Sequence, residues 1–218
     1  MSTRHYDRHL ADRVRLILRS VTKFVFDQPI FYEKVRIFLI GGHPFTQTLE
    51  LLDAKDTDVL LDVGCGPGLL AEKIRFKRYI GFDSNPKYIE IAKKRGISNT
   101  QFSLEDVSGY DFGKLRPDKA ILSGVLHHLN DSEALHVLKA LARTVSQWIV
   151  TDDPLYARYH VVNNLLCRLD RGEFIRSEKE MRKLFAEAGL EVEKRLIFYS
   201  NTWISKHIDF RLVSRQAA

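Results

Sequence analysis

The stretch LLDVGCGPGLL, residues 60–70, places three glycines directly behind a run of large apolar side chains. Gly64, Gly66 and Gly68 alternate with other residues, in the order G-x-G-x-G. A glycine-rich turn after a buried strand lets the backbone approach a ligand that a Cβ atom would block, and it presents N–H groups beside the start of a helix. Dinucleotides, nucleoside triphosphates and S-adenosylmethionine are the candidate ligands; a turn that needs glycine for its geometry alone is the structural alternative.

The spacing of the glycines separates these ligands. The dinucleotide fingerprint G-x-G-x-x-G would need a glycine at position 69. Leu69 occupies that position, and this departure from the fingerprint disfavours a dinucleotide as the ligand. No G-K-[ST] follows the glycines, which excludes a phosphate-binding P-loop. Asp83 stands about 20 residues after Asp62, where an acid can accept hydrogen bonds from ribose hydroxyls or cap a helix.

Composition predicts an ordinary globular protein. The 218 residues are 44% hydrophobic and 28% charged, and a chain of this length buries a large core in one domain without disulfides. Cys65 and Cys167 are far apart and lack metal-ligand spacing, so we expect no metal site. The charged amino terminus and the absence of a long apolar run predict a cytoplasmic protein without a membrane span.

The net charge of +6 raises the question of nucleic-acid binding. Acidic residues are interleaved with the basic ones, as in residues 168–183, RLDRGEFIRSEKEMRK, which hold six basic and four acidic side chains. A mixed, solvated surface explains this pattern, so we do not expect nucleic acid as a partner.

Strands and helices alternate from residue 58 onward. Apolar runs predict strands, and capping residues mark the helix starts at Asn85, Asn130 and Ser177. The predicted strands cover 58–64, 78–83, 100–106, 119–125 and 147–153, and a closing hairpin covers 191–200 and 203–215. The predicted helices cover 86–95, 130–144 and 178–188, after an N-terminal helix near 10–25 and a second helical stretch within 29–52. This alternation predicts an α/β fold with a doubly wound parallel sheet, helices on both faces and ligands beyond the carboxyl ends of the strands.

Residues 58–153 resemble a class I S-adenosylmethionine-dependent methyltransferase of the small-molecule, ubiquinone-biosynthesis-like branch. Four motifs carry the resemblance in the family's order: LDVGCGPG, GFDSNPKYIEIAKKRG, FSLEDVSGYDF and ILSGVLHHLND. The resemblance implies a Rossmann-like, seven-stranded sheet in the order 3-2-1-4-5-7-6 with strand 7 antiparallel, and an N-terminal helical cap.

The same resemblance implies S-adenosylmethionine as cofactor and S-adenosylhomocysteine as its product. It places the amino-acid end of the cofactor at Asp62 and the loop 64–68, the ribose at Asp83, and the adenine at Asp106 and the Val107 backbone. The other cofactor positions are Ser84, Ser123, Gly124 and Cys65, and we interpret Cys65 as a small loop residue rather than a nucleophile.

His127 and His128 follow the fourth predicted strand, where the transferable methyl group should point. Histidine is the side chain best suited to accept a proton near neutral pH. The segment is similar to phosphoethanolamine methyltransferases, in which a comparable LH carries a catalytic histidine paired with an N-terminal tyrosine. By that likeness His127 is the first candidate for a base and Tyr6 is its partner; hydrogen bonding or packing is the alternative role.

Candidate substrate contacts follow the fifth strand. TDDPLYARYH, residues 151–160, leaves the carboxyl edge of the sheet, while Asp153, before Pro154, is interpreted as a strand end. Arginine can bind a carboxylate or phosphate through two hydrogen bonds, so Arg176 is a further candidate. The substrate candidates are Asp152, Tyr156, Tyr159, His160 and Arg176.

We therefore expect a single methyltransferase domain over 1–218 that methylates an O or N atom of a small-molecule metabolite, as a monomer or homodimer. Its parts are a helical cap (1–55), a cofactor-binding core (56–153), a substrate-side insertion (154–176) and a closing helix and hairpin (177–218). Two other readings stay open: a methyltransferase that acts on RNA or protein, and a cofactor-binding module without turnover.

Overall fold

A computed structural model describes residues 45–156, 174–199 and 206–215. The N-terminal helix near 10–25 and most of the insertion at 154–176 lie outside the described residues. The domain layout as a whole therefore remains a prediction.

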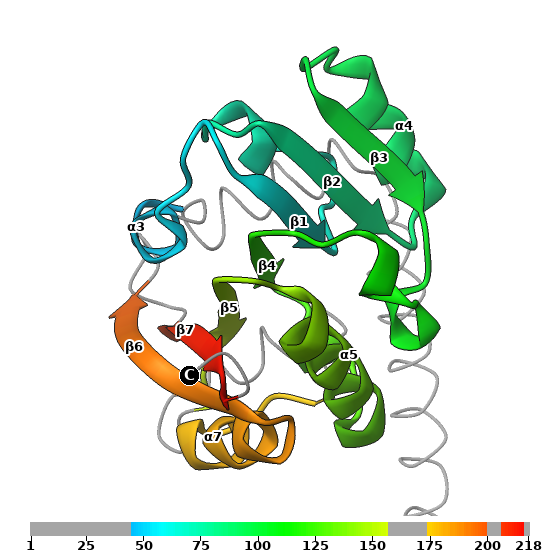
Figure 1. Ribbon diagram of the computed structural model, residues 1–218. Coiled ribbons are helices and arrows are strands. Elements are labelled where there is room, and N and C mark those ends of the chain that lie inside the picture. The colour runs from blue at the N-terminus through cyan, green and yellow to red at the C-terminus, as the bar shows by residue number, and fades with distance from the viewer. Residues whose placement is uncertain (1–44, 157–173, 200–205, 216–218) are drawn as a thin grey trace, which may run out of the picture.

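Seven strands form one sheet in the order β3-β2-β1-β4-β5-β7-β6. Strands β1 to β5 are parallel, and β7 runs antiparallel to both β5 and β6 (Figure 1). The predicted α/β class, strand order and antiparallel seventh strand are confirmed. The strands are β1 (Val59–Val63), β2 (Arg78–Asp83), β3 (Thr100–Leu104), β4 (Lys119–Ser123), β5 (Trp148–Pro154), β6 (Leu190–Tyr199) and β7 (Lys206–Ser214).

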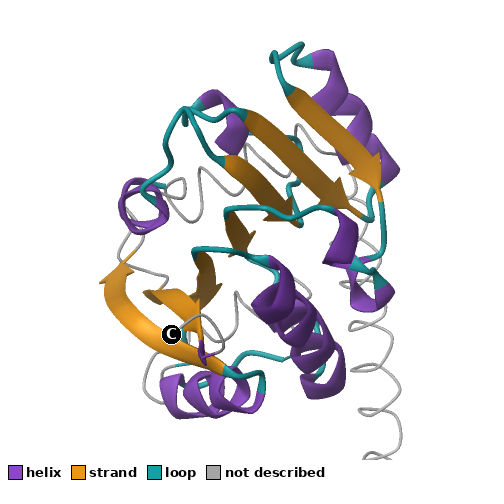
Figure 2. Ribbon diagram, in the orientation of Figure 1, coloured by secondary structure: helices purple, strands orange, loops and turns teal. Residues whose placement is uncertain are grey.

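Helices flank the sheet (Figure 2). The α-helices are α3 (Thr46–Leu52), α4 (Pro86–Lys94), α5 (Asp131–Thr144) and α7 (Glu178–Glu187). The short 3₁₀ helices are η1 (Leu70–Glu72), η2 (Val107–Gly109), η3 (Phe112–Lys114) and η4 (Leu126–His128). Because side chains alternate along a strand, Leu61 packs into the core shared with α5 and α7, whereas Leu60 packs on the opposite face with α4.

The helix starts are as predicted because their capping interactions are local. Asn85 accepts a hydrogen bond from Lys87 N, with Pro86 in the first helical position. Complete capping boxes join Asn130 to Glu133 at α5 and Ser177 to Glu180 at α7.

The connection after β1 differs from the expected strand-to-helix turn. The loop 64–68 leads into the single turn η1 rather than into a full helix. After η1 the chain reaches β2 at Arg78, so this crossover contains the 3₁₀ turn and no longer helix.

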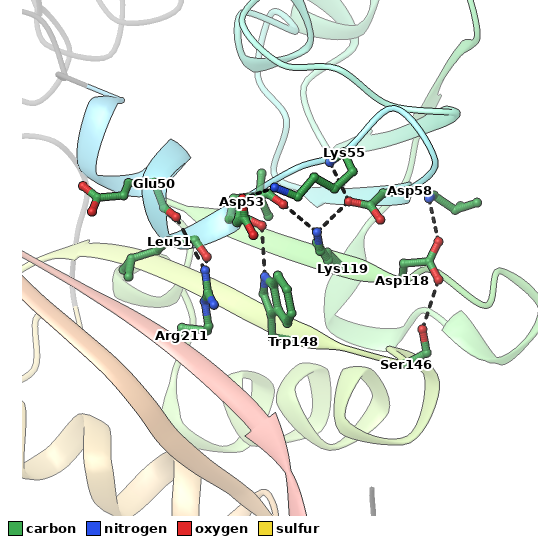
Figure 3. Close-up of polar contacts among 12 residues, drawn as sticks. Glu50, Leu51, Asp53, Lys55, Asp58, Asp118, Lys119, Ser146, Trp148 and Arg211 are labelled. Carbon is green, nitrogen blue, oxygen red and sulfur yellow. Dashed lines mark hydrogen bonds and ion pairs between the residues drawn. The ribbon is translucent and has the colours of Figure 1, made fainter.

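A buried lysine joins the chain before β1 to the amino end of β4. Lys119 Nζ lies 2.6 Å from Asp58 Oδ2 and 2.6 Å from the carbonyl oxygen of Asp53, and it stands over the Trp148 ring at 4.3 Å (Figure 3). Removing one partner of a buried ion pair typically costs about 3–5 kcal/mol, because the other charge is left uncompensated. Lys119 therefore fixes the path by which the chain enters β1.

The carboxyl end of α3 is held by donors from the sheet. Trp148 Nε1 donates to the carbonyl oxygen of Leu52 at 3.0 Å, and Arg211 Nε donates to that of Leu51 at 2.7 Å. The last carbonyl groups of a helix lack partners within it and favour positive charge, so these contacts satisfy them. α3 is thus fastened across β4, β5 and β7.

Candidate active site

The glycine loop, residues 64–68, folds against the end of β2. The backbone N–H groups of Gly64 and Cys65 both donate to the carbonyl oxygen of Phe82 at 2.8 Å. One residue further on, Gly66 N donates to Asp83 Oδ2 at 2.9 Å. The two predicted cofactor-binding elements are therefore joined by direct hydrogen bonds.

Each glycine of the loop adopts a positive φ, at 77° for Gly64, 52° for Gly66 and 75° for Gly68. A Cβ atom at Gly64 would lie 2.5 Å from Val125 Cγ2, so glycine is required there by packing. At Gly66 a Cβ atom would meet nothing within 4 Å. The loop thus presents backbone to open space beside Asp83, a cradle suited to a ligand that approaches closely.

The other loop residues support this shape. Arg95 Nε, at the end of α4, donates to the carbonyl oxygen of Pro67 at 2.5 Å, and its Nη1 pairs with Glu72. Cys65 is buried, and burial together with the nearby carboxylates raises the pKa of its thiol. A thiol kept protonated is a poor nucleophile, in agreement with the interpretation of Cys65 as a loop residue.

Asp83 is half-buried at the carboxyl end of β2. Its Oδ1 atom accepts from Asn85 N at 2.8 Å, and its Oδ2 atom accepts from Gly66 N. Burial raises the pKa of Asp83, against the opposing effect of these two backbone hydrogen bonds. Carboxylate oxygens have several lone pairs, so the half-exposed group can still accept from a diol.

Asp62 faces the core rather than the open side of the loop. It is buried, and Tyr79 on β2 donates a hydrogen bond from its hydroxyl group to Asp62 Oδ2. Burial is the main cause that raises the pKa of Asp62 to about 7, which the Tyr79 hydrogen bond partly opposes. Its carboxyl group therefore ties β1 to β2 directly below the glycine loop.

The predicted adenine segment begins where β3 ends. Asp106 is exposed, and its Oδ1 accepts from Ser108 N at 3.0 Å and from Ser108 Oγ at 2.7 Å, so it caps η2, which Val107 opens. Leu104, the last residue of β3, is 53% exposed. Sequence reasoning did not single out Leu104, although an apolar side chain between Ser103 and Glu105 was the available signal.

Ser123 and Gly124 end β4 beside β5. Ser123 Oγ donates to Asp152 Oδ2 at 2.7 Å, and Gly124 N donates to the backbone oxygen of Asp152 at 2.7 Å. Asp152 was expected to contact a substrate, yet it is only 1% exposed. We therefore interpret Asp152 as a residue that shapes the end of β4.

Asp152 also pairs with an acid from β7 that sequence reasoning missed. Asp152 and Asp209 are register partners, so their side chains share one face of the sheet. Thr48 of α3 donates to Asp209 Oδ2 at 2.8 Å, and His207 Nδ1 lies 3.3 Å from Asp152 Oδ1. Burial, and then the charge of Asp152, raise the pKa of Asp209, as expected for two close carboxyl groups that share a proton.

His127 lies within η4, directly beyond β4, and is buried. Its Nδ1 atom is 2.8 Å from Asp153 Oδ1, and its backbone N donates to the same oxygen at 3.1 Å. His128 is exposed, with its ring centroid 4.0 Å from that of His127. Asp153 was predicted only to end a strand, and its contact with His127 could not be read from the sequence.

Arg176 was expected to bind a substrate anion, but it is only 6% exposed and its donors point into the protein. Nε and Nη2 donate to Asp131 Oδ1 at 2.9 and 2.7 Å, Nη1 to the carbonyl oxygen of Leu126 at 2.6 Å, and Nη2 to that of Leu129 at 2.7 Å. The guanidinium group thus holds the turn between η4 and α5, and we interpret Arg176 as structural.

Three candidates, Tyr6, Tyr159 and His160, lie outside the described residues. Tyr156 is 46% exposed after β5, and its backbone N donates to the Arg176 carbonyl oxygen at 3.3 Å. Ser84 is exposed next to Asp83.

The glycine loop, Asp83, Asp106 and His127 lie at the carboxyl ends of β1, β2, β3 and β4, respectively. They lie at one edge of the sheet, because the carboxyl ends of parallel strands meet there. In Figure 1 the arrowheads of β1, β2 and β3 point toward this edge. Within residues 45–156, 174–199 and 206–215, no three His, Cys, Asp or Glu side chains are arranged to hold a metal ion. Nor does any helix in those ranges combine the length and apolar character needed to cross a membrane.

The chain is similar to known methyltransferases. Trans-aconitate 2-methyltransferase of Mycobacterium ulcerans (strain Agy99) is 29% identical over 119 residues, which cover 52% of this chain and 43% of that protein. The chain therefore matches less than half the length of that relative. An S-adenosylmethionine-dependent methyltransferase of Methanosarcina mazei superposes with a TM-score of 0.60 at 17% identity, covering 79% of this chain and 98% of that one.

CalO1, a methyltransferase of calicheamicin biosynthesis in its S-adenosylhomocysteine-bound form, superposes with a TM-score of 0.58 at 15% identity. The alignment covers 78% of this chain and 54% of CalO1. At these identities the structural neighbours establish the fold alone. The family model of a methyltransferase domain matches residues 38–195, well over half of the sequence, and so this chain belongs to the methyltransferase domain family.

Proposed function

We propose that this protein is an S-adenosylmethionine-dependent methyltransferase that transfers a methyl group to an O or N atom of a small-molecule metabolite. The observation that carries the proposal is the glycine loop folded against Asp83, with Gly66 N donating to Asp83 Oδ2 at 2.9 Å. A backbone cradle at the end of β1 beside an acid at the end of β2 suits a ligand that has both an extended chain and a ribose.

Each part of the site has a role in this proposal. The glycine loop and Ser123 with Gly124 hold the amino-acid end of S-adenosylmethionine, and Asp83 accepts hydrogen bonds from its ribose. Asp106 and the Val107 backbone bind the adenine, with the exposed Leu104 beside them as an apolar surface. Asp62 supports the loop through Tyr79. When bound, the cofactor supplies a methyl group on a sulfonium, which is already activated for displacement.

Transfer of such a methyl group depends mainly on alignment of the acceptor, since holding reactants in line accounts for much of a large rate gain. An acceptor hydroxyl or ammonium group must also lose a proton, and a positioned base adds about 10² to 10⁴-fold. We propose His127 as that base, because it lies at the carboxyl end of β4 beside Gly124.

The proposal of a small-molecule acceptor is supported by the relatives named for trans-aconitate methylation. The described residues add a constraint, because Arg176 is committed to the fold and three buried acids, Asp152, Asp153 and Asp209, lie at the ends of β5 and β7. Lys206 begins β7 next to Leu155 at the same end of the sheet, so a lysine lies near these acids. The constraint is that Arg176 is not available to bind a carboxylate group of the acceptor.

A labelled-methyl assay tests the proposal. The protein is incubated with S-adenosylmethionine carrying a labelled methyl group and with metabolites that bear hydroxyl, carboxyl or amine groups, and in parallel with total RNA and total protein. We expect label in the small-molecule fraction, S-adenosylhomocysteine in equal amount, and loss of both with Asp83→Ala.

Label found only in RNA or protein would contradict a small-molecule acceptor and would show that the acceptor is a macromolecule. Tight binding of S-adenosylhomocysteine without any labelled product would favour a module that does not turn over. The matched control is Glu90→Ala, since Glu90 is an exposed acid on α4 that pairs with Lys94 away from the loop.

A further inference from the structure

We propose that Asp153 is a positioning residue for His127, and that it fixes the tautomer of the ring so that Nε2 is the atom that accepts a proton. The inference rests on the proposed function, because the proton would come from the methyl acceptor. Its structural part concerns only two side chains of this protein and can be tested without any ligand.

The contacts of Asp153 are concentrated on His127. Among the described residues, both hydrogen bonds of the Asp153 carboxyl group go to His127, one from the backbone N at 3.1 Å and one with Nδ1 at 2.8 Å. Both end on Oδ1, and Oδ2 is buried without a partner in the described part of the chain. Asp153 is 1% exposed and His127 is 5% exposed.

This arrangement selects one tautomer. Oδ1 already accepts the backbone N–H of His127, so it serves as an accepting oxygen toward Nδ1 as well. An ionised carboxylate can only accept, and a proton on the carboxyl group would be placed on Oδ2, which has no described contact. In either state Nδ1 carries the hydrogen and the lone pair is on Nε2.

The ring lies at the right place for this role. A Cβ atom at Gly124 would lie 3.7 Å from Cε1 of His127, so the edge of the ring that joins Nδ1 to Nε2 faces the carboxyl end of β4. Gly124 has φ of +69°, and its backbone N is held by the Asp152 carbonyl oxygen. His127 is therefore held by Asp153, with its ring next to the end of β4.

Burial and the neighbouring carboxyl group favour uptake of a proton by the pair formed by Asp153 and His127. Burial raises the pKa of Asp153 to about 8, with a further increase from Asp152 on the same strand. The backbone hydrogen bond from His127 and the charges of His128 and Arg176 act in the opposite direction. These groups lie on β5, on η4 and in the turn before α7, and Asp209 on β7 also interacts electrostatically with Asp153.

The step is balanced. The nucleophilic O or N atom of the acceptor forms a bond to the methyl carbon, the sulfur–methyl bond breaks, and its electron pair stays on sulfur. The proton of the acceptor passes to Nε2 of His127, and the resulting imidazolium is stabilised through Nδ1–H by Asp153 Oδ1. Release of that proton to solvent returns the pair to its first state.

A purely structural role for Asp153 is the competing explanation, since its bond to the backbone N of His127 also holds η4. Asp153→Asn separates the two roles. The amide oxygen can keep both hydrogen bonds, but the side chain can no longer ionise to stabilise the imidazolium. Asp153→Ala removes the hydrogen bonds as well.

The direct experiment is an NMR titration of the histidine ring nitrogens in the full chain without ligand. In the wild-type protein we expect the neutral ring of His127 to carry its hydrogen on Nδ1. Asp153→Asn should move the titration midpoint of His127 down by about 1 to 3 pH units, the size expected when a close opposite charge is removed. Asp153→Ala should give a measurable population with the hydrogen on Nε2. Asp209→Asn, which removes a buried acid on β7 without a bond to His127, should leave the tautomer unchanged.

A double-mutant cycle on turnover completes the test. Asp153→Asn should lower kcat by about 10²-fold or more while S-adenosylhomocysteine affinity stays within about twofold, and it should have no further effect when combined with His127→Ala. An unchanged tautomer and midpoint in the Asp153 variants would overturn the inference, as would an equal loss of kcat in the His127→Ala background. If no acceptor is ever methylated, the proposed function fails, and the NMR titration still decides whether Asp153 positions His127.

Discussion

Gly66 N donates to Asp83 Oδ2 at 2.9 Å, so the turn after β1 and the acid at the end of β2 form one unit. A change at either residue therefore acts on the other. A Cβ atom at position 66 would meet no atom within 4 Å, so packing inside the protein does not require glycine there. Its open side is the part of the loop that we assign to the ligand.

The first prediction compares Gly66→Ala with Gly64→Ala. Both place a side chain at positive φ, which costs about 1–2 kcal/mol. Gly64→Ala adds a clash with Val125, worth about 1–3 kcal/mol, so it should be clearly less stable in urea unfolding. Gly66→Ala should remain folded but bind S-adenosylhomocysteine at least about tenfold more weakly, which is ~1.4 kcal/mol. Undiminished affinity in Gly66→Ala would exclude the cradle from ligand binding.

The second prediction concerns Arg176, which we interpret as structural. Arg176→Met removes the charged donor from three backbone carbonyl groups and should lower the free energy of unfolding by about 3 kcal/mol. Arg215→Met removes an exposed pair with Glu191 and should change it by less than about 0.5 kcal/mol. If Arg176→Met is as stable as the wild type and only its affinity for the methyl acceptor falls, Arg176 binds the substrate and our structural interpretation is wrong.

The third prediction is a pH dependence of stability from Asp62. The folded-state pKa of about 7 lies above the ordinary value, so the folded protein holds the proton more tightly than the unfolded chain does. The stabilising contribution is complete below the ordinary value and is lost as the pH rises through about 7. Asp62→Asn keeps an acceptor for Tyr79 and has no proton to lose.

Urea unfolding from pH 5 to pH 8 measures this effect. The stability of Asp62→Asn relative to the wild type should increase between pH 5 and about 7 by at most about 3 kcal/mol and then level off. Glu90→Gln, at an exposed acid, should follow the wild-type curve. Parallel curves for Asp62→Asn and the wild type would contradict the raised pKa.

The sheet order and the helix starts could be predicted because their signals are local. Apolar runs mark the buried strands, and a cap such as Asn130 with Glu133 is made within four consecutive residues. The resemblance of the four motifs to methyltransferases then implied the strand order. The local patterns and the motifs predict the same fold, which is typical of a sequence that specifies one structure.

The acids of the site could not be predicted in the same way, because their partners are distant in the sequence. Asp209 meets Asp152 through the β5–β7 pairing and Thr48 across 161 positions of the chain. Asp153 reaches His127 only because β5 lies beside β4. Arg176 resembled an exposed arginine in a charged segment until its contacts with the η4–α5 turn were visible.

The account depends most on the assignment of Asp83, and calorimetric titration with S-adenosylhomocysteine tests it directly. Loss of two hydrogen bonds to a charged group should cost about 3 kcal/mol or more, so Asp83→Ala should bind at least about 100-fold more weakly than the wild type, while Glu90→Ala binds normally. Thermal unfolding of each variant shows whether the fold is kept. Equal affinity of Asp83→Ala and the wild type, or no binding by the wild type, would contradict the proposal that this edge of the sheet holds S-adenosylmethionine.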